Sequence, residues 1–149
     1  MEKSVRDRWD TVFAEGRDFT VLNEFLLQEV LKEAARRGIT QKRVLDLGCG
    51  TGQSSLLFAR YGCTVSAVDI SSVALEKARA RATAEAVGDP SLRFIEADLE
   101  NLTDTTLSGD FDLIHLKLVL AFIKNKDGLL AYSADHLVQP GMVMITSPI

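Results

Sequence analysis

Cysteine, histidine and proline are scarce in this chain of 149 residues, which has two cysteines, two histidines and three prolines. Cys49 and Cys63 are too few for the disulfide framework of a small secreted domain. The histidines and cysteines form no cluster with the spacing of metal ligands, so we expect no metal site. We therefore interpret the chain as a reduced, cytoplasmic protein.

The sequence also lacks an excess of positive charge and a long apolar run. It has 17 Lys and Arg against 21 Asp and Glu, which gives a net charge of −4. Nucleic-acid backbones are bound by clustered positive charge, so we expect no nucleic-acid partner. No apolar stretch approaches the roughly 18–20 residues that span a bilayer. Residues 1–20 are charged throughout and lack the apolar core of a signal peptide, so we expect no membrane association.

The most informative stretch covers residues 44–52, Val-Leu-Asp-Leu-Gly-Cys-Gly-Thr-Gly. A short apolar run that contains an acid, Asp46, passes directly into glycines at alternate positions, Gly48, Gly50 and Gly52. Glycine lets the backbone bend sharply and lets a ligand lie against it. Helical spacing of apolar residues over 53–61 predicts that the turn opens a helix, whose free N–H groups suit a carboxylate. A strand, a glycine-rich turn and a helix in this order are typical of a site for an adenosine-containing cofactor.

The details of the turn distinguish two classes of cofactor. A nicotinamide fingerprint would need Gly or Ala where this chain has Gln53 or Ser55. Asp46 would repel a pyrophosphate, whereas a charge-assisted hydrogen bond to a cofactor ammonium contributes roughly 1.5–3 kcal/mol. The turn therefore favours a cofactor with an ammonium group, and a nicotinamide-dependent oxidoreductase stays as an alternative.

Strands and helices are predicted to alternate from residue 21 onward. We expect a helix at 21–37 capped by Thr20, and further helices at 53–61, 72–87 and 127–138. Strands are expected at 43–47, 64–70, 92–97, 111–116 and 142–146, with Pro140-Gly141 between the last helix and the last strand. Strands joined by helices predict right-handed crossovers and a parallel sheet, and hence an α/β fold in a single domain.

Acids follow the first three predicted strands, at the edge where parallel sheets bind ligands. Asp69 lies about 20 residues beyond the glycine turn, the spacing at which an acid reaches ribose hydroxyls. Asp98 is placed to accept a hydrogen bond from an adenine amine. Each acid alone is also compatible with a surface or capping position, so the prediction depends on their combination with the glycine turn.

Residues 41–145 resemble the class I S-adenosylmethionine-dependent methyltransferases, with matching motifs at 44–52, 65–71, 94–98, 111–114 and 137–141. The resemblance implies a Rossmann-like three-layer sandwich with a sheet of about five strands in the order 3-2-1-4-5. It implies S-adenosyl-L-methionine as cofactor, S-adenosyl-L-homocysteine as product, and methyl transfer to a small-molecule acceptor by direct displacement. A catalytically silent cofactor-binding module is the other alternative.

The resemblance also implies site residues. Ile70 and Leu99 are expected to sandwich the adenine, and Leu116 and Lys117 to contact the methionine part, although Lys117 is also compatible with a surface salt bridge. The full expected cofactor set is Asp46, Gly48, Cys49, Gly50, Gly52, Asp69, Ile70, Asp98, Leu99 and Leu116. Family members often carry a histidine where this chain has Ala121 or Phe122, so no general base is identified. We interpret His115 and His136 as structural.

We also make predictions about the N-terminal and C-terminal segments of the chain. Residues 1–20 are expected to form an arm over the core at 21–149, with Trp9 and Phe13 as a lid or as core anchors. Class I methyltransferases add two strands after the fifth, whereas this sequence stops directly after its predicted fifth strand. We therefore expect a truncated domain without the C-terminal β-hairpin, which forms a homodimer through the edge of strand five.

Overall fold

A computed structural model describes residues 3–17, 22–102, 107 and 109–146. Five strands form one sheet in the order β3-β2-β1-β4-β5, and every neighbouring pair is parallel. The strands are β1 (Arg43–Leu47), β2 (Thr64–Asp69), β3 (Leu92–Glu96), β4 (Phe111–Lys117) and β5 (Leu137–Thr146). The predicted α/β fold and strand order are confirmed.

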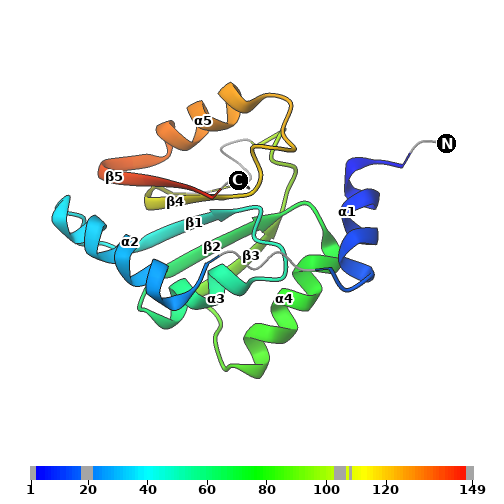
Figure 1. The fold of residues 1–149 in the computed structure, drawn as a ribbon, viewed down its shortest axis with the longest axis horizontal. Helices are drawn as coiled ribbons and strands as arrows, with labels where there is room; N and C mark the ends of the chain where they lie inside the picture. The colour runs from blue at the N-terminus through cyan, green and yellow to red at the C-terminus, as the bar shows by residue number, and fades with distance from the viewer. Residues whose placement is uncertain (1–2, 18–21, 103–106, 108, 147–149) are drawn as a thin grey trace.

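Helices cover both faces of this sheet. They are α1 (Val5–Ala14), α2 (Glu24–Arg36), α3 (Gln53–Arg60), α4 (Ser72–Ala84) and α5 (Lys126–Asp135). Helices α2, α3 and α4 lie on one face and α5 lies on the other, while α1 stands beside α4 at the end of the sheet (Figure 1). The arrangement is a three-layer sandwich with an additional helix at the edge where β1 and β2 end.

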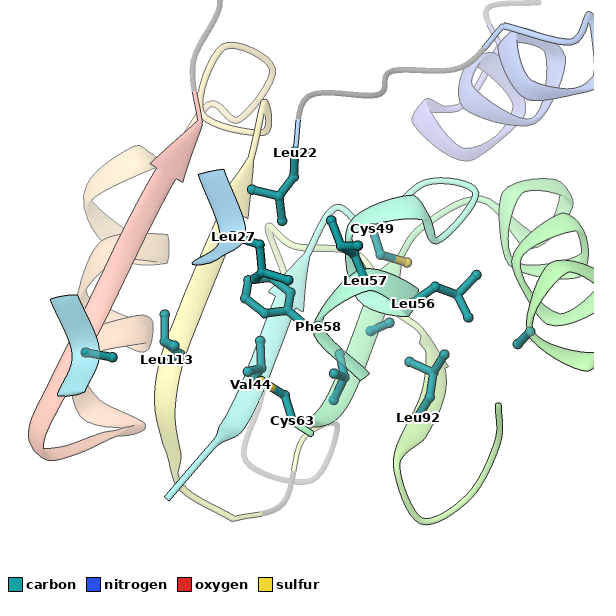
Figure 2. Packing of buried hydrophobic residues seen from close by; sticks show 14 of the residues in the cluster. Leu22, Leu27, Val44, Cys49, Leu56, Leu57, Phe58, Cys63, Leu92 and Leu113 are labelled. Carbon is teal, nitrogen blue, oxygen red and sulfur yellow. The ribbon is translucent and has the colours of Figure 1, made fainter. Parts of the chain in front are cut away.

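Each face of the sheet has its own apolar core, because side chains alternate along a strand. Val44 and Leu113 point toward α2 and α3 and pack with the fully buried Phe58 (Figure 2). Leu45 and Ile114, one residue further along the same strands, pack on the opposite face against Leu129 of α5. The strands that lead to the glycine turn are therefore packed on both faces.

Three predicted helix boundaries were wrong by three residues each. Helix α2 begins at Glu24, because Asn23 Oδ1 accepts a hydrogen bond from Leu26 N at 2.8 Å; Thr20, the predicted cap, lies outside the described residues. Helix α4 ends at Ala84 rather than at residue 87, and α5 ends at Asp135 rather than at residue 138.

Strand β5 begins five residues before its predicted start. Leu137 already pairs with Phe111, and regular pairing resumes at Met142 opposite Leu113 after an irregularity. Pro140 has no N–H to donate to the ladder, so the segment that contains it forms a bulge inside the strand. The Pro-Gly pair therefore interrupts β5 and does not precede it.

Strand β5 also forms one edge of the described sheet, since it pairs only with β4 there. The predicted homodimer through this edge stays a prediction. Among the described residues, no helix is long and apolar enough to cross a membrane.

Candidate cofactor site

The glycine turn joins β1 to α3 in a conformation that L-residues with side chains rarely adopt. Gly48, Gly50 and Gly52 all have positive φ, at 77°, 57° and 86°. A Cβ at Gly48 would collide with the Val119 side chain, and a Cβ at Gly50 would lie 3.4 Å from the Phe13 ring. Val119 and Phe13 thus approach the turn so closely that a side chain at Gly48 or Gly50 would meet them. The predicted contact of the glycines with a cofactor stays a prediction.

A cavity lies directly beyond this turn, at the carboxyl ends of the strands. Six residues of the predicted cofactor set line it: Gly48, Gly50, Asp69, Ile70, Asp98 and Leu99. The three predicted substrate and lid residues, Trp9, Phe13 and Lys117, line it as well. One cavity therefore brings together residues from five segments that lie far apart in the sequence.

Six further residues complete the wall and were not predicted: Val5, Glu100, Leu118, Val119, Phe122 and Ile123. Most belong to the segment that follows β4, where Leu118 turns the chain out of the strand with a positive φ of 55°. This segment carries no motif. Its position after a central strand of a parallel sheet was the one available signal, because all such connections meet at the same edge.

Asp69 is fixed at the cavity by two backbone hydrogen bonds. Gly50 N donates to its Oδ2 at 2.9 Å, and Ser71 N donates to its Oδ1 at 2.9 Å. Burial raises the pKa of Asp69 above its usual range, although these hydrogen bonds and the charge of Lys117 act in the opposite direction. Each carboxylate oxygen keeps a second lone pair, so Asp69 can accept further hydrogen bonds from a ligand.

Asp46 lies below the turn and does not line the cavity. It is fully buried, and its Oδ2 accepts hydrogen bonds from Ser54 Oγ at 2.9 Å and Ser55 Oγ at 2.6 Å, in the first turn of α3. Its Oδ1 lies 3.0 Å from His115 Nδ1. Burial opposes ionisation, yet His115, Ser55 and Lys117 together hold the pKa of Asp46 below its usual value. Its predicted contact with a cofactor ammonium stays a prediction.

His115 continues this buried network across the sheet. The side chain is fully buried, and its Nε2 lies 2.9 Å from Thr146 Oγ1 at the end of β5. The network therefore joins the first turn of α3, β1, β4 and β5. This position agrees with the structural interpretation of His115; His136 caps the end of α5, away from the cavity.

The other residues of the predicted set also do not line the cavity. Cys49 and Leu116 are fully buried in the cores on opposite faces of the sheet. Burial raises the pKa of the Cys49 thiol well above its ordinary value, so the thiol stays neutral. Gly52 caps α3 and packs closely against Ala78 of α4. Their predicted ligand contacts stay predictions.

Asp98 and its neighbours form the far end of the cavity, beyond β3. Asp98 Oδ1 accepts from Glu100 N at 3.0 Å, and its Oδ2 accepts from the Asn101 side chain at 3.1 Å. Ile70 and Leu99 line the cavity beside this acid. In the described ranges, no group of three or more His, Cys, Asp or Glu could hold a metal ion.

Helix α1 covers the cavity and is held there by polar contacts. Arg6 donates to the Ile70 carbonyl at 2.7 Å and pairs with Glu96 at 2.7 Å. Asp10 Oδ1 accepts a hydrogen bond from Ser71 Oγ at 2.5 Å, and Lys77 donates to the Phe13 carbonyl.

Aromatic rings close the same side of the cavity. The Trp9 ring stands edge-on to Phe122, with centroids 5.0 Å apart, and lies 6.0 Å from Phe13. Phe13 is buried, whereas Phe122 is 61% exposed. The rings of α1 thus lie over the glycine turn and meet the segment after β4, as a cover over a ligand would.

Comparison with protein-family models matches residues 44–141 to a family described as a methyltransferase domain. Among curated proteins, the chain is 29% identical to a magnesium protoporphyrin IX methyltransferase of Arabidopsis thaliana, over 95% of this chain and 47% of that protein. It is 32% identical to a mitochondrial ubiquinone biosynthesis O-methyltransferase of Schizosaccharomyces pombe, over 83% of this chain and 43% of that protein.

A third curated relative is a trans-aconitate 2-methyltransferase of Deinococcus radiodurans, 35% identical over 71% of this chain and 38% of that protein. The chain thus spans less than half the length of these three relatives.

Solved structures share the fold. An S-adenosylmethionine-dependent methyltransferase from Clostridium acetobutylicum has a TM-score of 0.69 at 22% identity, covering 93% of this chain and 54% of that chain. The Synechocystis magnesium protoporphyrin IX methyltransferase with bound S-adenosylmethionine has a TM-score of 0.66 at 21% identity, covering 89% and 70%. The fold of this chain is therefore a known architecture.

Proposed function

The chain belongs to the S-adenosylmethionine-dependent methyltransferases, and on this premise we propose that it binds S-adenosylmethionine and methylates a small-molecule acceptor. The observation that carries the proposal is the cavity itself. It combines an open glycine backbone, a fixed carboxylate at Asp69 and an apolar wall at Ile70 and Leu99. These are the groups that a ribose, an adenine and an amino-acid chain require.

Each part of the cofactor has a proposed partner. Asp69 accepts from the ribose hydroxyls, since its Oδ1 and Oδ2 keep free lone pairs. Ile70 and Leu99 hold the adenine between them, and Asp98 accepts from its exocyclic amine. The methionine part lies along the cavity wall that Gly48 and Gly50 form.

The acceptor enters from the side of α1, in this proposal. Trp9, Phe13 and Phe122 form an apolar surface there, suited to the flat or apolar body of a small molecule. The names of the relatives refer to magnesium protoporphyrin IX, ubiquinone biosynthesis and trans-aconitate, which supports a small-molecule acceptor.

The bound cofactor would supply an activated methyl group on a sulfonium, with a neutral thioether as leaving group. The protein's own residues then have two tasks: alignment of the acceptor atom with the methyl carbon, and exclusion of water. Such positioning contributes about 7–11 kcal/mol to rate acceleration. Helix α1 and its rings perform the second task. Ala121 and Phe122 offer no histidine general base at the positions where family members often carry one.

A thermal-shift screen tests the proposal against both alternatives. S-adenosylmethionine and S-adenosylhomocysteine are expected to raise the melting midpoint, and NAD is not. Stabilisation by NAD alone would identify an oxidoreductase. Binding of S-adenosylhomocysteine without methyl transfer from labelled S-adenosylmethionine to any small acceptor would favour a silent cofactor-binding module.

A further inference from the structure

Helix α1 lies beside α4 and has little apolar contact with the rest of the protein (Figure 1). Of the ten residues of α1, which the structure describes in full, only Phe13 is buried. A helix of this length is marginally stable in water on its own, so it needs partners to stay helical. The polar contacts of α1 are therefore important for keeping it over the cavity.

Asp10 connects α1 to the buried start of α4. Its Oδ1 accepts hydrogen bonds from Ser71 Oγ at 2.5 Å and from Val73 N at 3.3 Å, and Ser71 is fully buried. The other charged pair of α1, Arg6 with Glu96, has side chains that are 40% and 44% exposed. Exposed ion pairs contribute little to stability, so Asp10 makes the stronger attachment.

Asp10 also supplies a charge that the start of α4 lacks. Ser71 is the N-cap of α4, and its Oγ accepts a hydrogen bond from Ala74 N at 3.1 Å. The first turn of α4 contributes no acid of its own. A negative charge is stabilised there by the free N–H groups and the dipole of the helix. The carboxylate of Asp10 takes this position from another helix.

The same serine holds the acid that faces the cavity. Ser71 N donates to Asp69 Oδ1 at 2.9 Å, while Ser71 Oγ donates to Asp10. Between the two acids, Ile70 lines the cavity, and its carbonyl accepts a hydrogen bond from Arg6 at 2.7 Å. Residues 69–73 therefore contribute to the cavity through Asp69 and Ile70 and bind α1 through Ile70, Ser71 and Val73. One conformation of this segment serves both contacts.

We propose that Asp10 is a positioning residue that couples the docking of α1 to the binding of the cofactor at Asp69. A ligand that fixes residues 69–73 removes part of the entropy cost of docking α1 there. The docked α1 does the same for the ligand, because such coupling is reciprocal. This coupling rests on the proposed function, which makes Asp69 a cofactor ligand, and extends that function to the helix that covers the cavity.

Amide hydrogen exchange with and without S-adenosylhomocysteine measures the coupling. Exchange over residues 5–14 reports docking, because an undocked helix of this length loses its hydrogen bonds. The coupling factor is the ratio of the exchange rate of the ligand-free protein to that of the saturated protein, and calorimetry establishes saturation. Exchange over residues 43–47 of β1 reports the stability of the core.

Three variants are compared with wild type. Asp10→Ala removes the acceptor for Ser71 and Val73, and Asp10→Asn keeps an acceptor oxygen there without the charge. Asp7→Ala is the matched control, because Asp7 is an exposed acid in the first turn of the same helix. Its loss weakens α1 equally in the ligand-free and saturated proteins.

Asp10→Ala is expected to reduce the coupling factor roughly three- to tenfold, as for a lost helix cap. Asp10→Asn should give a value between those of Asp10→Ala and wild type. Asp7→Ala should keep the wild-type coupling factor within about twofold, even where its ligand-free exchange is faster. Exchange over residues 43–47 should be the same in all four proteins.

An equal coupling factor in wild type and Asp10→Ala would overturn the inference alone, because binding of S-adenosylhomocysteine by wild type would still support the proposed function. Exchange over residues 43–47 that accelerates in Asp10→Ala as much as exchange over α1 would also overturn it, by assigning Asp10 to the stability of the whole fold. Failure of the wild-type protein to bind S-adenosylhomocysteine would overturn both.

Discussion

The acids at the ends of β1 and β2 look alike in the sequence and differ in the structure. Asp46 and Asp69 each follow a run of apolar residues and precede a helix. Asp46 is sealed beneath the glycine turn by Ser54, Ser55 and His115. Asp69 lines the cavity and holds the turn through the N–H of Gly50. The Asp46 carboxylate lies beneath the turn in the protein interior, and the Asp69 carboxylate faces the cavity.

The register of the sheet explains the difference. Asp46 pairs with Ala67, so Asp69 lies two residues, or about 6.6 Å, further toward the carboxyl edge. Asp46 also shares the face of Val44, which is the face covered by α3. An acid one residue inside its strand is thus enclosed by the next helix, whereas an acid at the strand end reaches the cavity. Their pKa values shift in opposite directions accordingly.

Replacing Asp46 is expected to have the largest effect, and on stability. Asp46→Ala leaves His115 and two serine hydroxyls without their shared partner, which should reduce the free energy of unfolding by about 3–5 kcal/mol. Urea denaturation at pH 7 measures the loss. Asp69→Ala is the matched control, with a much smaller expected loss. A reduction below about 1 kcal/mol for Asp46→Ala would show that the network does not brace the turn.

Replacing Asp69 should act on binding instead. Asp69→Ala removes the acceptor of the ribose hydroxyls, so affinity for S-adenosylhomocysteine should fall by roughly 1.5–3 kcal/mol, about ten- to a hundredfold. Isothermal titration calorimetry checks this value at a temperature where the variant is folded. A change of less than threefold would mean that Asp69 is not the ribose ligand.

The opposite pKa shifts predict a smaller, pH-dependent effect. Because the folded-state pKa of Asp69 is raised, acidification should protonate it above the ordinary aspartate value of about 3.9, while Asp46 stays ionised. Affinity for S-adenosylhomocysteine should therefore weaken before the fold is lost. Asp69→Asn should bind weakly with no pH dependence in this range. Equal pH dependence in wild type and Asp69→Asn would contradict the assignment.

Because their pKa values shift in opposite directions, Asp46 and Asp69 contribute to the pH dependence of folding stability with opposite signs. The contribution of Asp69 is fully present below its unfolded-state pKa and is lost as the pH rises through its raised folded-state pKa. The contribution of Asp46 is present above its unfolded-state pKa and is lost as the pH falls through its lowered folded-state pKa. Denaturation of Asp46→Asn and wild type across this range should converge at the acidic end.

Removing the far end of the network should have the smallest effect. Thr146→Val keeps the shape of the side chain and deletes the hydroxyl that meets His115 Nε2. Thr146 is only half-buried, so water can replace part of the contact, and a loss of about 0.5–1.5 kcal/mol is expected. Denaturant titration of Thr146→Val beside Thr146→Ser, which keeps the hydroxyl, checks it. A loss as large as that of Asp46→Ala would show that the hydroxyl of Thr146 on β5 contributes as much to stability as Asp46 does.

Sequence patterns predicted the elements well where periodicity is strong. The bounds of β1 agree with the structure, and those of the other strands up to β4 differ by one residue at most. Asp69 and Asp98 were expected at one site because parallel strands end at one edge, and the resemblance to the methyltransferases added Ile70 and Leu99. The structure brings all four to one cavity.

Other features depend on three-dimensional register, which no local pattern encodes. The contact of Asp46 with His115 joins strands that pair across 69 positions of sequence. The bulge around Pro140 resembles a helix-to-strand boundary in the sequence, since Pro-Gly marks both. Leu118 and Val119 belong to a segment of ordinary apolar composition. Their position in the cavity wall depends on how this segment folds over the glycine turn, which the sequence alone did not indicate.

The central claim is that Asp69 faces the ligand while Asp46 braces the turn. Parallel calorimetric titrations of S-adenosylhomocysteine into Asp46→Asn and Asp69→Asn, below the melting range of both variants, test it most directly. The predicted result is a loss of at least tenfold in affinity for Asp69→Asn and a change within about threefold for Asp46→Asn. A greater loss of affinity in Asp46→Asn than in Asp69→Asn would contradict the claim and assign the ligand contact to Asp46.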